Sequence, residues 1–82
     1  MDIGVFMKNI IITGAGSGVG KAVAMLLKGE NLILVDMAKE KVEAVANELH
    51  QKSFVCDVTD TNQIKKLKQF VSNSFDKIDK SA

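Results

Sequence analysis

The 82-residue sequence contains no proline, tryptophan or tyrosine, and it has a single cysteine, Cys56. One cysteine cannot form an internal disulfide, which favours a reducing compartment, so we expect a cytoplasmic location. No apolar stretch is long enough to span a bilayer, and the first residues, MDIGVFMKN, lack the charged leader and long apolar core of a signal peptide. A formal net charge of +1 gives no reason to expect nucleic acid or an acidic membrane surface as a partner.

The order of apolar segments predicts alternating strands and helices. We expect strands over residues 6–13, 31–36 and 53–58, each with a nearly continuous apolar run suited to burial on both faces. Helices are expected over residues 18–28 and 37–51, and from a cap at Thr59 or Asp60 to about residue 75. This βαβαβα order predicts a parallel sheet with right-handed crossovers, the first half of a three-layer, doubly wound, Rossmann-like α/β fold.

Each expected helix carries apolar residues at helical spacing, which predicts the face that packs on the sheet. The residues expected to face inward are Val19, Ala22, Val23, Leu26 and Leu27 in the first helix, Val42, Val45, Ala46 and Leu49 in the second, and Ile64, Leu67, Phe70 and Val71 in the third.

The segment TGAGSGVG, residues 13–20, lies between the first strand and the first helix. A P-loop is excluded because Ala15 and Ala22 stand where its first glycine and its Ser/Thr should be. The pattern G-x-G-x-x-G started at Gly14 also fails, because Val19 takes the place of the third glycine. The segment does match T-G-x-x-x-G-x-G. A glycine-rich tight turn without a ligand is the alternative.

With Thr13, Gly14, Gly18 and Gly20 in place, the chain resembles the short-chain dehydrogenase/reductase family, whose nucleotide loop has this form. Asp36 closes the second strand about 20 residues later, where an acid can bind both hydroxyls of an adenosine ribose. The alternative role for Asp36 is to cap the next helix.

The cofactor that this resemblance implies is NAD rather than NADP. In the family an acid at the position of Asp36 favours NAD, because a carboxylate would repel a 2′-phosphate. NADP-preferring members often carry Arg or Lys in the loop, where this chain has Ser17, and Met37 follows Asp36, so no cation waits for an extra phosphate.

The third strand ends in Asp57-Val58, which resembles the family's pair beside the adenine. By that resemblance Asp57 would accept a hydrogen bond from the adenine amino group and Val58 would pack near the ring, whereas the alternative for Asp57 is a plain turn residue. The resemblance extends to FDKID, residues 75–79, the family's lead into its fourth strand. The expected cofactor-binding residues are Thr13, Gly14, Ser17, Gly18, Val19, Gly20, Asp36, Met37, Asp57 and Val58.

The catalytic part of the family, a Ser with a Tyr-x-x-x-Lys pair, has no counterpart in a sequence without tyrosine. We therefore expect residues 1–82 to be a partial NAD(P)-binding Rossmann domain with no catalytic residue and no metal site, and residues 1–6 to be an upstream extension if Met7 is the natural start. Intact members transfer hydride between NAD(H) and an alcohol or carbonyl compound. Two alternatives stay open: a non-enzymatic adenine-nucleotide-binding module, and a fragment that assembles with another chain.

The resemblance also implies a partner. In the family's sheet the first strand lies between the second and the fourth, so residues 6–13 are expected to expose an apolar edge that invites homo-oligomers or aggregation. His50, near a helix end, and Cys56, within an apolar strand, are expected to be structural.

Overall fold

The computed structural model describes residues 3–6 and 9–81, with side chains described within 3–4 and 9–74. The elements in chain order are β1 (Ile3–Phe6), β2 (Asn9–Thr13), α1 (Gly18–Leu26), β3 (Asn31–Asp36), α2 (Lys39–Leu49), β4 (Lys52–Val55) and α3 (Thr61–Ser81). No helix in the described ranges is both long enough and apolar enough to cross a membrane.

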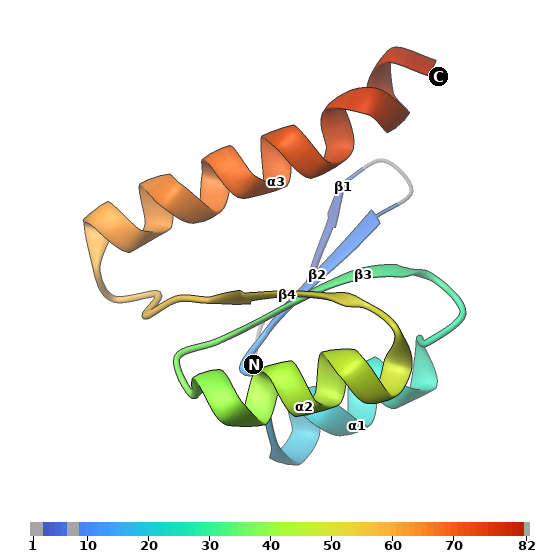
Figure 1. Cartoon of the computed structure of the whole chain (residues 1–82), viewed down its shortest axis with the longest axis vertical. Coiled ribbons are helices and arrows are strands. Elements are labelled where there is room, and N and C mark those ends of the chain that lie inside the picture. The colour runs from blue at the N-terminus through green and yellow to red at the C-terminus, as the bar shows by residue number, and fades with distance from the viewer. Residues whose placement is uncertain (1–2, 7–8, 82) are drawn as a thin grey trace.

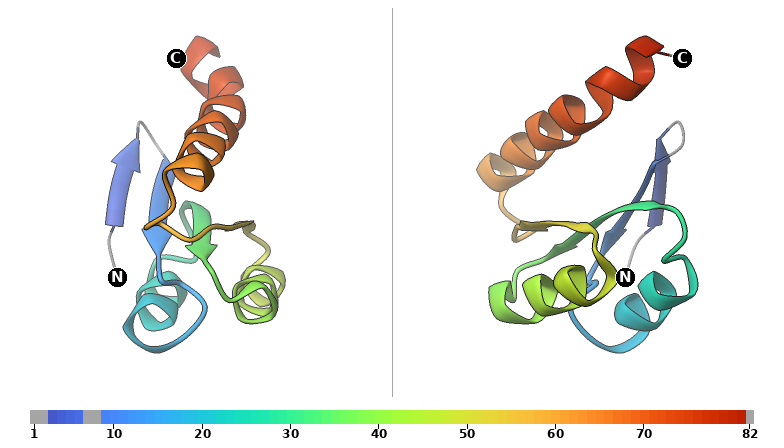
Figure 2. Two further views of the ribbon diagram at one scale, coloured as in Figure 1. Left: turned by 90° about the vertical axis from the view of Figure 1, so that its left-hand side faces the viewer. Right: turned by 45° about the vertical axis from the view of Figure 1, so that its right-hand side comes forward.

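The strands form one sheet in the order β1-β2-β3-β4. Strands β2, β3 and β4 are parallel, with Ile12 opposite Leu34 and Leu34 opposite Ser53. Helices α1 and α2 lie on one side of the sheet and α3 lies on the other (Figures 1 and 2). The chain therefore has the predicted three-layer, Rossmann-like α/β architecture.

Two apolar clusters hold these layers together, one on each face of the sheet. Leu32 and Leu34 of β3 pack with α1 and α2, whereas Ile33 and Val35 pack with α3. Alternate side chains of a strand point to opposite faces, so a strand covered on both sides must be apolar throughout. This explains the unbroken run NLILV in the middle of the sheet.

The amino-terminal part of the sheet differs from the prediction. A single strand over residues 6–13 was expected, but Phe6 belongs to β1, which runs antiparallel to β2 and pairs Ile3 with Ile12. Residues 7–8, which include the proposed start Met7, lie outside the described residues. The expectation that the first long strand exposes a free edge is therefore wrong, because β1 pairs with the backbone of β2 at that edge.

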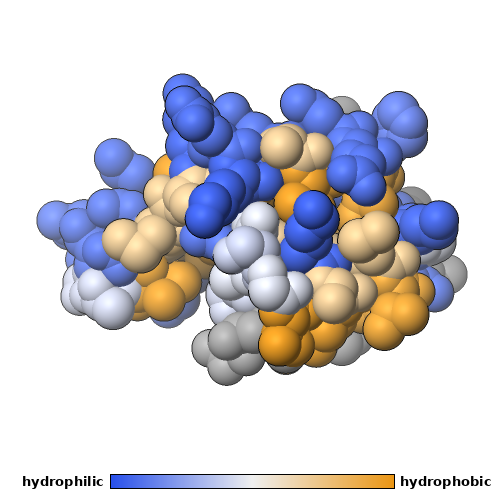
Figure 3. Space-filling view, turned by 90° about the horizontal axis from the view of Figure 1, so that it is seen from below, coloured by the Kyte–Doolittle hydropathy of each residue, from blue (hydrophilic) through white to orange (hydrophobic). Residues whose placement is uncertain are grey.

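The predicted inward face is correct for α2 and α3 and only partly correct for α1. Of the residues predicted to face inward, Val23 and the C-cap residue Leu27 pack against the core, whereas Val19, Ala22 and Leu26 are exposed. Ala24, which was not predicted, is fully buried. The residue that sets this orientation is Gly20, which is buried where the helix approaches the preceding loop. Figure 3, a view from the side that carries α1 and α2, shows apolar patches among hydrophilic side chains.

The remaining boundaries differ by a few residues. Strand β4 ends at Val55 rather than 58, and α3 continues to Ser81 instead of ending near residue 75. Of the two residues predicted as the cap of α3, Thr59 and Asp60, the structure uses Asp60, whose Oδ1 accepts hydrogen bonds from the N–H groups of Asn62 (2.9 Å) and Gln63 (3.3 Å). The segment FDKID is accordingly helical in this structure.

Candidate dinucleotide-binding cleft

A cleft of about 260 Å³ lies where β2, β3 and β4 end. The carboxyl ends of parallel strands meet at one edge of a sheet, and ligands of open α/β sheets bind in the crevice outside that edge. The residues that line the cleft are Thr13, Gly14, Val35, Asp36, Met37, Cys56, Asp57, Val58 and Thr59. Six of these are among the ten predicted cofactor-binding residues, so three segments far apart in the sequence meet here.

The glycine loop joins β2 to α1 and lies against this cleft. Gly14 and Gly18 have φ angles of 66° and 60°, which favour glycine because it has no Cβ. A Cβ at Gly20 would run into the backbone carbonyl of Gly14, so α1 packs against the loop only if this position is glycine. The N–H of Ala15 donates to the carbonyl of Val35 (3.1 Å) and ties the loop to β3.

The first turn of α1 is open to a ligand. Ser17 is the N-cap residue, in an extended conformation, and its side chain makes no capping hydrogen bond. The first N–H groups of a helix have no intrahelical acceptor, and the helix dipole adds partial positive charge there. Because Ser17 and Gly18 are exposed, the N–H groups at the start of α1 can donate hydrogen bonds to the oxygens of a phosphate group.

Asp36 connects the loop to the start of α2. Its Oδ2 accepts a hydrogen bond from the N–H of Gly16 (2.8 Å), and its Oδ1 accepts one from the N–H of Ala38 (3.1 Å). Both oxygens therefore hold the backbone in place, one in the glycine loop and one at Ala38, the residue before α2. The second contact is similar to the helix-capping role that the sequence offered as the alternative for Asp36. Each carboxylate oxygen has a second lone pair, so these bonds leave acceptor capacity for a ligand.

Gly16 is a residue of this site that the sequence argument missed, because it lies at a variable position of the glycine motif. A Cβ at Gly16 would come within 2.8 Å of Asp36 Oδ2 and 3.2 Å of the backbone nitrogen of Val42. Glycine at this position thus lets the loop approach both Asp36 and α2. The signal was present in the sequence as an extra glycine between Gly14 and Gly18.

Asp57 shapes the turn between β4 and α3. Its Oδ1 accepts hydrogen bonds from both the N–H (2.9 Å) and the hydroxyl (2.6 Å) of Thr59. These two bonds hold the pKa of the Asp57 carboxyl below its ordinary value. Its own N–H donates to Oε1 of Gln63 (2.7 Å), which makes Asp57 a turn residue as well as a cleft residue.

Apolar side chains surround the polar groups of the cleft and its approach. Val19, Met37 and Val58 are 66 %, 67 % and 49 % exposed. Large apolar side chains left in water near a concave site favour a ligand that carries an apolar or aromatic surface.

Cys56 lines the cleft and is buried, as predicted, although it follows the last residue of β4 instead of lying within the strand. Its N–H donates to the carbonyl of Asp36 (3.0 Å), which extends the pairing of β3 and β4 by one residue. Burial raises the pKa of the thiol, and the negative charges of Asp57 and Asp60 raise it further. A protonated, buried thiol is a packing group and a poor nucleophile.

The four remaining predicted residues, Ser17, Gly18, Val19 and Gly20, form the turn into α1 instead of the cleft lining. Comparison with known proteins shows the family to which the chain belongs. The profile of the family described as short chain dehydrogenase matches residues 8–80.

The chain belongs to the short-chain dehydrogenase family. Among curated relatives of this family, an uncharacterized oxidoreductase of Staphylococcus aureus (strain USA300) is 38 % identical over 77 residues, which cover 88 % of this chain and 33 % of the relative. An uncharacterized oxidoreductase of Listeria monocytogenes (strain EGD-e) is 39 % identical over 79 residues, 88 % of this chain and 32 % of the relative. This short-chain dehydrogenase sequence thus spans about one third of the length of the relatives it matches.

Proposed function

We propose that this chain is the dinucleotide-binding part of a short-chain dehydrogenase-type oxidoreductase and that it holds the adenosine and pyrophosphate of NAD(H). The observation that carries the proposal is the cleft at the carboxyl ends of β2, β3 and β4, where the glycine loop, Asp36 and Asp57 meet. Three separate sequence motifs converge on one concave site of the kind that binds nucleotides in α/β sheets.

The residues of the cleft fit a dinucleotide group by group. The open first turn of α1, with Gly18 at its start, would bind the pyrophosphate oxygens through backbone N–H groups. Asp36 would accept hydrogen bonds from the ribose hydroxyls while it keeps the loop in place through Gly16. Asp57 would accept one from the adenine amino group, and Val58 would pack against the ring.

Charge favours NAD over NADP at this site. A 2′-phosphate on the adenosine ribose would lie against the Asp36 carboxylate, and like charges in contact repel. Ser17 and Met37 are the uncharged neighbours where a cation would be needed to accept that phosphate.

The reaction proposed for the complete oxidoreductase is hydride transfer to or from an alcohol or carbonyl compound, for which a bound NAD supplies or accepts the hydride. This chain contributes binding and orientation only, because proton transfer in the family pattern needs a tyrosine, and the sequence has none.

The test is calorimetric titration of the 82-residue chain with NAD, NADH and NADP. We expect saturable binding of NAD and NADH, with weaker binding of NADP. In Gly18→Val the branched side chain would stand at the phosphate position, where the structure has open space, so binding should be lost. Because a φ of 60° strains any residue other than glycine, circular dichroism and thermal unfolding of the variant must show that the fold is retained. Gly29→Val is the control for added bulk, because a Cβ at Gly29 also meets nothing within 4 Å, although the φ of Gly29 is not positive. The melting temperatures of both variants therefore separate backbone strain at Gly18 from loss of the phosphate contact. Equal binding by the two variants would refute the proposed role of the loop.

A further inference from the structure

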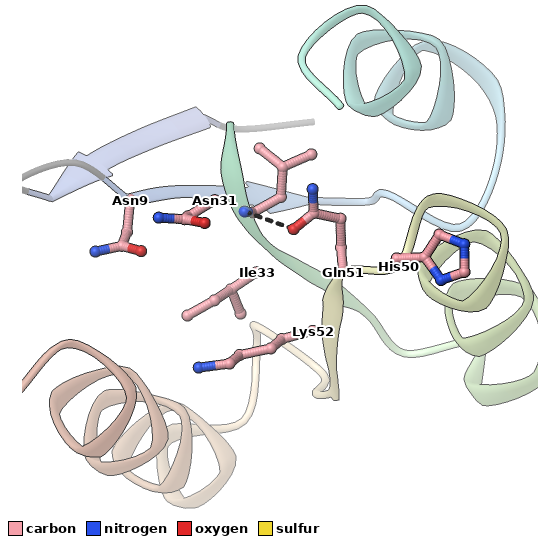
Figure 4. A pocket seen from close by; sticks show the side chains of 7 residues that line it. Asn9, Asn31, Ile33, His50, Gln51 and Lys52 are labelled. Atoms are coloured by element: carbon pink, nitrogen blue, oxygen red, sulfur yellow. Dashed lines mark hydrogen bonds between the residues drawn. The ribbon is translucent and has the colours of Figure 1, made fainter. Parts of the chain in front are cut away.

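A second cavity, of about 340 Å³, lies at the opposite edge of the sheet, where the parallel strands begin. Its lining consists of Asn9, Asn31, Leu32, Ile33, His50, Gln51 and Lys52 (Figure 4). The cavity shares no residue with the dinucleotide cleft, which lies at the carboxyl ends of the same strands.

Strand register brings three polar side chains together here. Asn9, Asn31 and Lys52 are the first residues of β2, β3 and β4, with Asn9 opposite Asn31 and Ile33 opposite Lys52. Side chains two residues apart share a face of a strand, and Ile33 belongs to the cluster packed against α3. Figure 4 shows Asn9, Ile33 and Lys52 reaching toward the side where α3 lies, while His50 points away from them.

Gln51 builds the wall of the cavity and has no donor left for a ligand. Its Oε1 accepts the N–H of Leu32 (3.0 Å), and its Nε2 donates to the carbonyls of Lys28 (3.0 Å) and Glu30 (2.8 Å). These bonds fasten the start of β4 to the start of β3. The positions of Asn31 and Lys52 at the cavity are thereby held by the framework of the sheet.

The side-chain amide of Asn9 is buried at this cavity without an acceptor for its N–H groups in the described part of the chain. Its side chain is only 4 % exposed, and its Nδ2 is buried with no hydrogen-bond partner among the described residues. A buried amide N–H without an acceptor costs free energy that an acceptor atom from a ligand would recover. Within the described lining no Asp or Glu is present to act as that acceptor, whereas Lys52 supplies a positive charge.

We propose that this cavity binds a small oxyanion, a carboxylate or phosphate, with one oxygen accepting the Asn9 Nδ2–H and the charge balanced by Lys52. Asn31 adds a second amide at the same edge. The volume is roughly ten times the 30 Å³ that one water occupies in the liquid, so the cavity has room for an anion of this size. This site is independent of the proposed nucleotide binding.

The experiment is an NMR titration of the ¹⁵N-labelled 82-residue chain with inorganic phosphate and, separately, with succinate, at an ionic strength kept constant with NaCl. We expect saturable shifts of the Asn9 side-chain amide in at least one titration. Shifts with phosphate alone assign a phosphate site, shifts with succinate alone or with both assign a carboxylate-accepting site, and shifts with neither overturn the proposal. Because phosphate also suits the glycine loop, the titration is repeated in Gly18→Val, where the response at Asn9 should persist. Its loss in that variant would assign the anion to the loop instead.

Three variants distinguish binding in this cavity from nonspecific attraction of anions to the positive charges of the surface. Lys52→Met should weaken anion binding about ten-fold, while Lys66→Met, which removes an equal charge from the exposed surface of α3, should leave it unchanged. Asn9→Leu should abolish binding and leave the unliganded chain at least as stable, because the orphan amide is replaced by an apolar group of similar shape. Equal weakening in Lys52→Met and Lys66→Met, or full binding by a folded Asn9→Leu, would refute the site.

Discussion

Asp36 has two roles in this account, and one substitution separates them. Without a ligand, its carboxylate accepts hydrogen bonds from Gly16 and Ala38 and so joins the glycine loop to α2. With a dinucleotide it would also bind the ribose. Asp36→Asn keeps the size of the side chain but removes the charge, and it places an amide NH₂ opposite one backbone N–H.

The expected loss in stability follows from one broken charge-assisted hydrogen bond. Such bonds contribute about 1.5 to 3 kcal/mol, against a free energy of unfolding of roughly 4 to 12 kcal/mol for a chain of this length. Asp36→Asn should therefore fold at 25 °C but melt roughly 10 °C lower, since each kcal/mol shifts Tm by about 4 to 8 °C in a domain of this size. Thermal unfolding followed by circular dichroism measures this shift.

The proposed contact of Asp36 with the ribose is tested by comparing the affinities for NAD and NADP. Asp36→Asn should weaken NAD binding about ten-fold and reduce the preference for NAD over NADP. Asp60→Asn is the matched control: it disturbs the cap of α3 and lowers stability, but it lies outside the cleft and should leave the preference unchanged. An Asp36→Asn chain with the melting temperature of the parent would refute the loop contacts, and an unchanged NAD-to-NADP ratio would refute the ribose assignment.

Three further outcomes are expected. Gly20→Ala should destabilise the chain strongly in thermal unfolding, because its Cβ would meet the carbonyl of the glycine loop, whereas Gly29→Ala should behave like the parent. Since the Thr59 hydrogen bonds lower the folded-state pKa of Asp57, they stabilise the fold above about pH 4, and this contribution is lost as the pH falls through the lowered pKa. Thr59→Val should therefore make the acid-side loss of stability shallower in urea titrations between pH 2 and about 6, and an unchanged slope would exclude this linkage. The purified chain should show only background NADH oxidation with a panel of carbonyl compounds, and saturable turnover would demand a proton donor other than tyrosine.

The order of elements could be predicted from the sequence because local signals agree with the fold. The run NLILVD is apolar at every buried position, and NIIIT is apolar at every buried position except Asn9. The apolar residues of α2 lie on one face, which leaves one way to pack that helix on the sheet. For α1 the sequence does not decide which face packs on the sheet, since its apolar residues fit two neighbouring faces of the helix. Close packing at Gly20 decides between them, and that contact depends on a loop conformation that periodicity does not contain.

The β1–β2 pairing and the second cavity were beyond the sequence argument for a similar reason. No Gly, Pro, Asn or Asp stands at positions 7 and 8 of the sequence, so nothing predicted the antiparallel pairing of β1 with β2. The bonds of Asp36 to Gly16 and of Gln51 to Leu32 join residues 20 and 19 positions apart and follow from tertiary placement. The cleft itself was predictable, because parallel strands must bring their carboxyl ends to one edge.

The most direct test of the central claim is an amide map of ADP-ribose binding by NMR, with ¹⁵N-labelled chain titrated to saturation. The account predicts shifts that saturate together and are confined to the glycine loop (residues 13–20), to Asp36 and Met37, and to residues 56–59, with little change at Asn9, Asn31 and Lys52 at the other edge of the sheet. Absence of saturable binding, or shifts that leave the glycine loop and Asp36 unchanged, would contradict it.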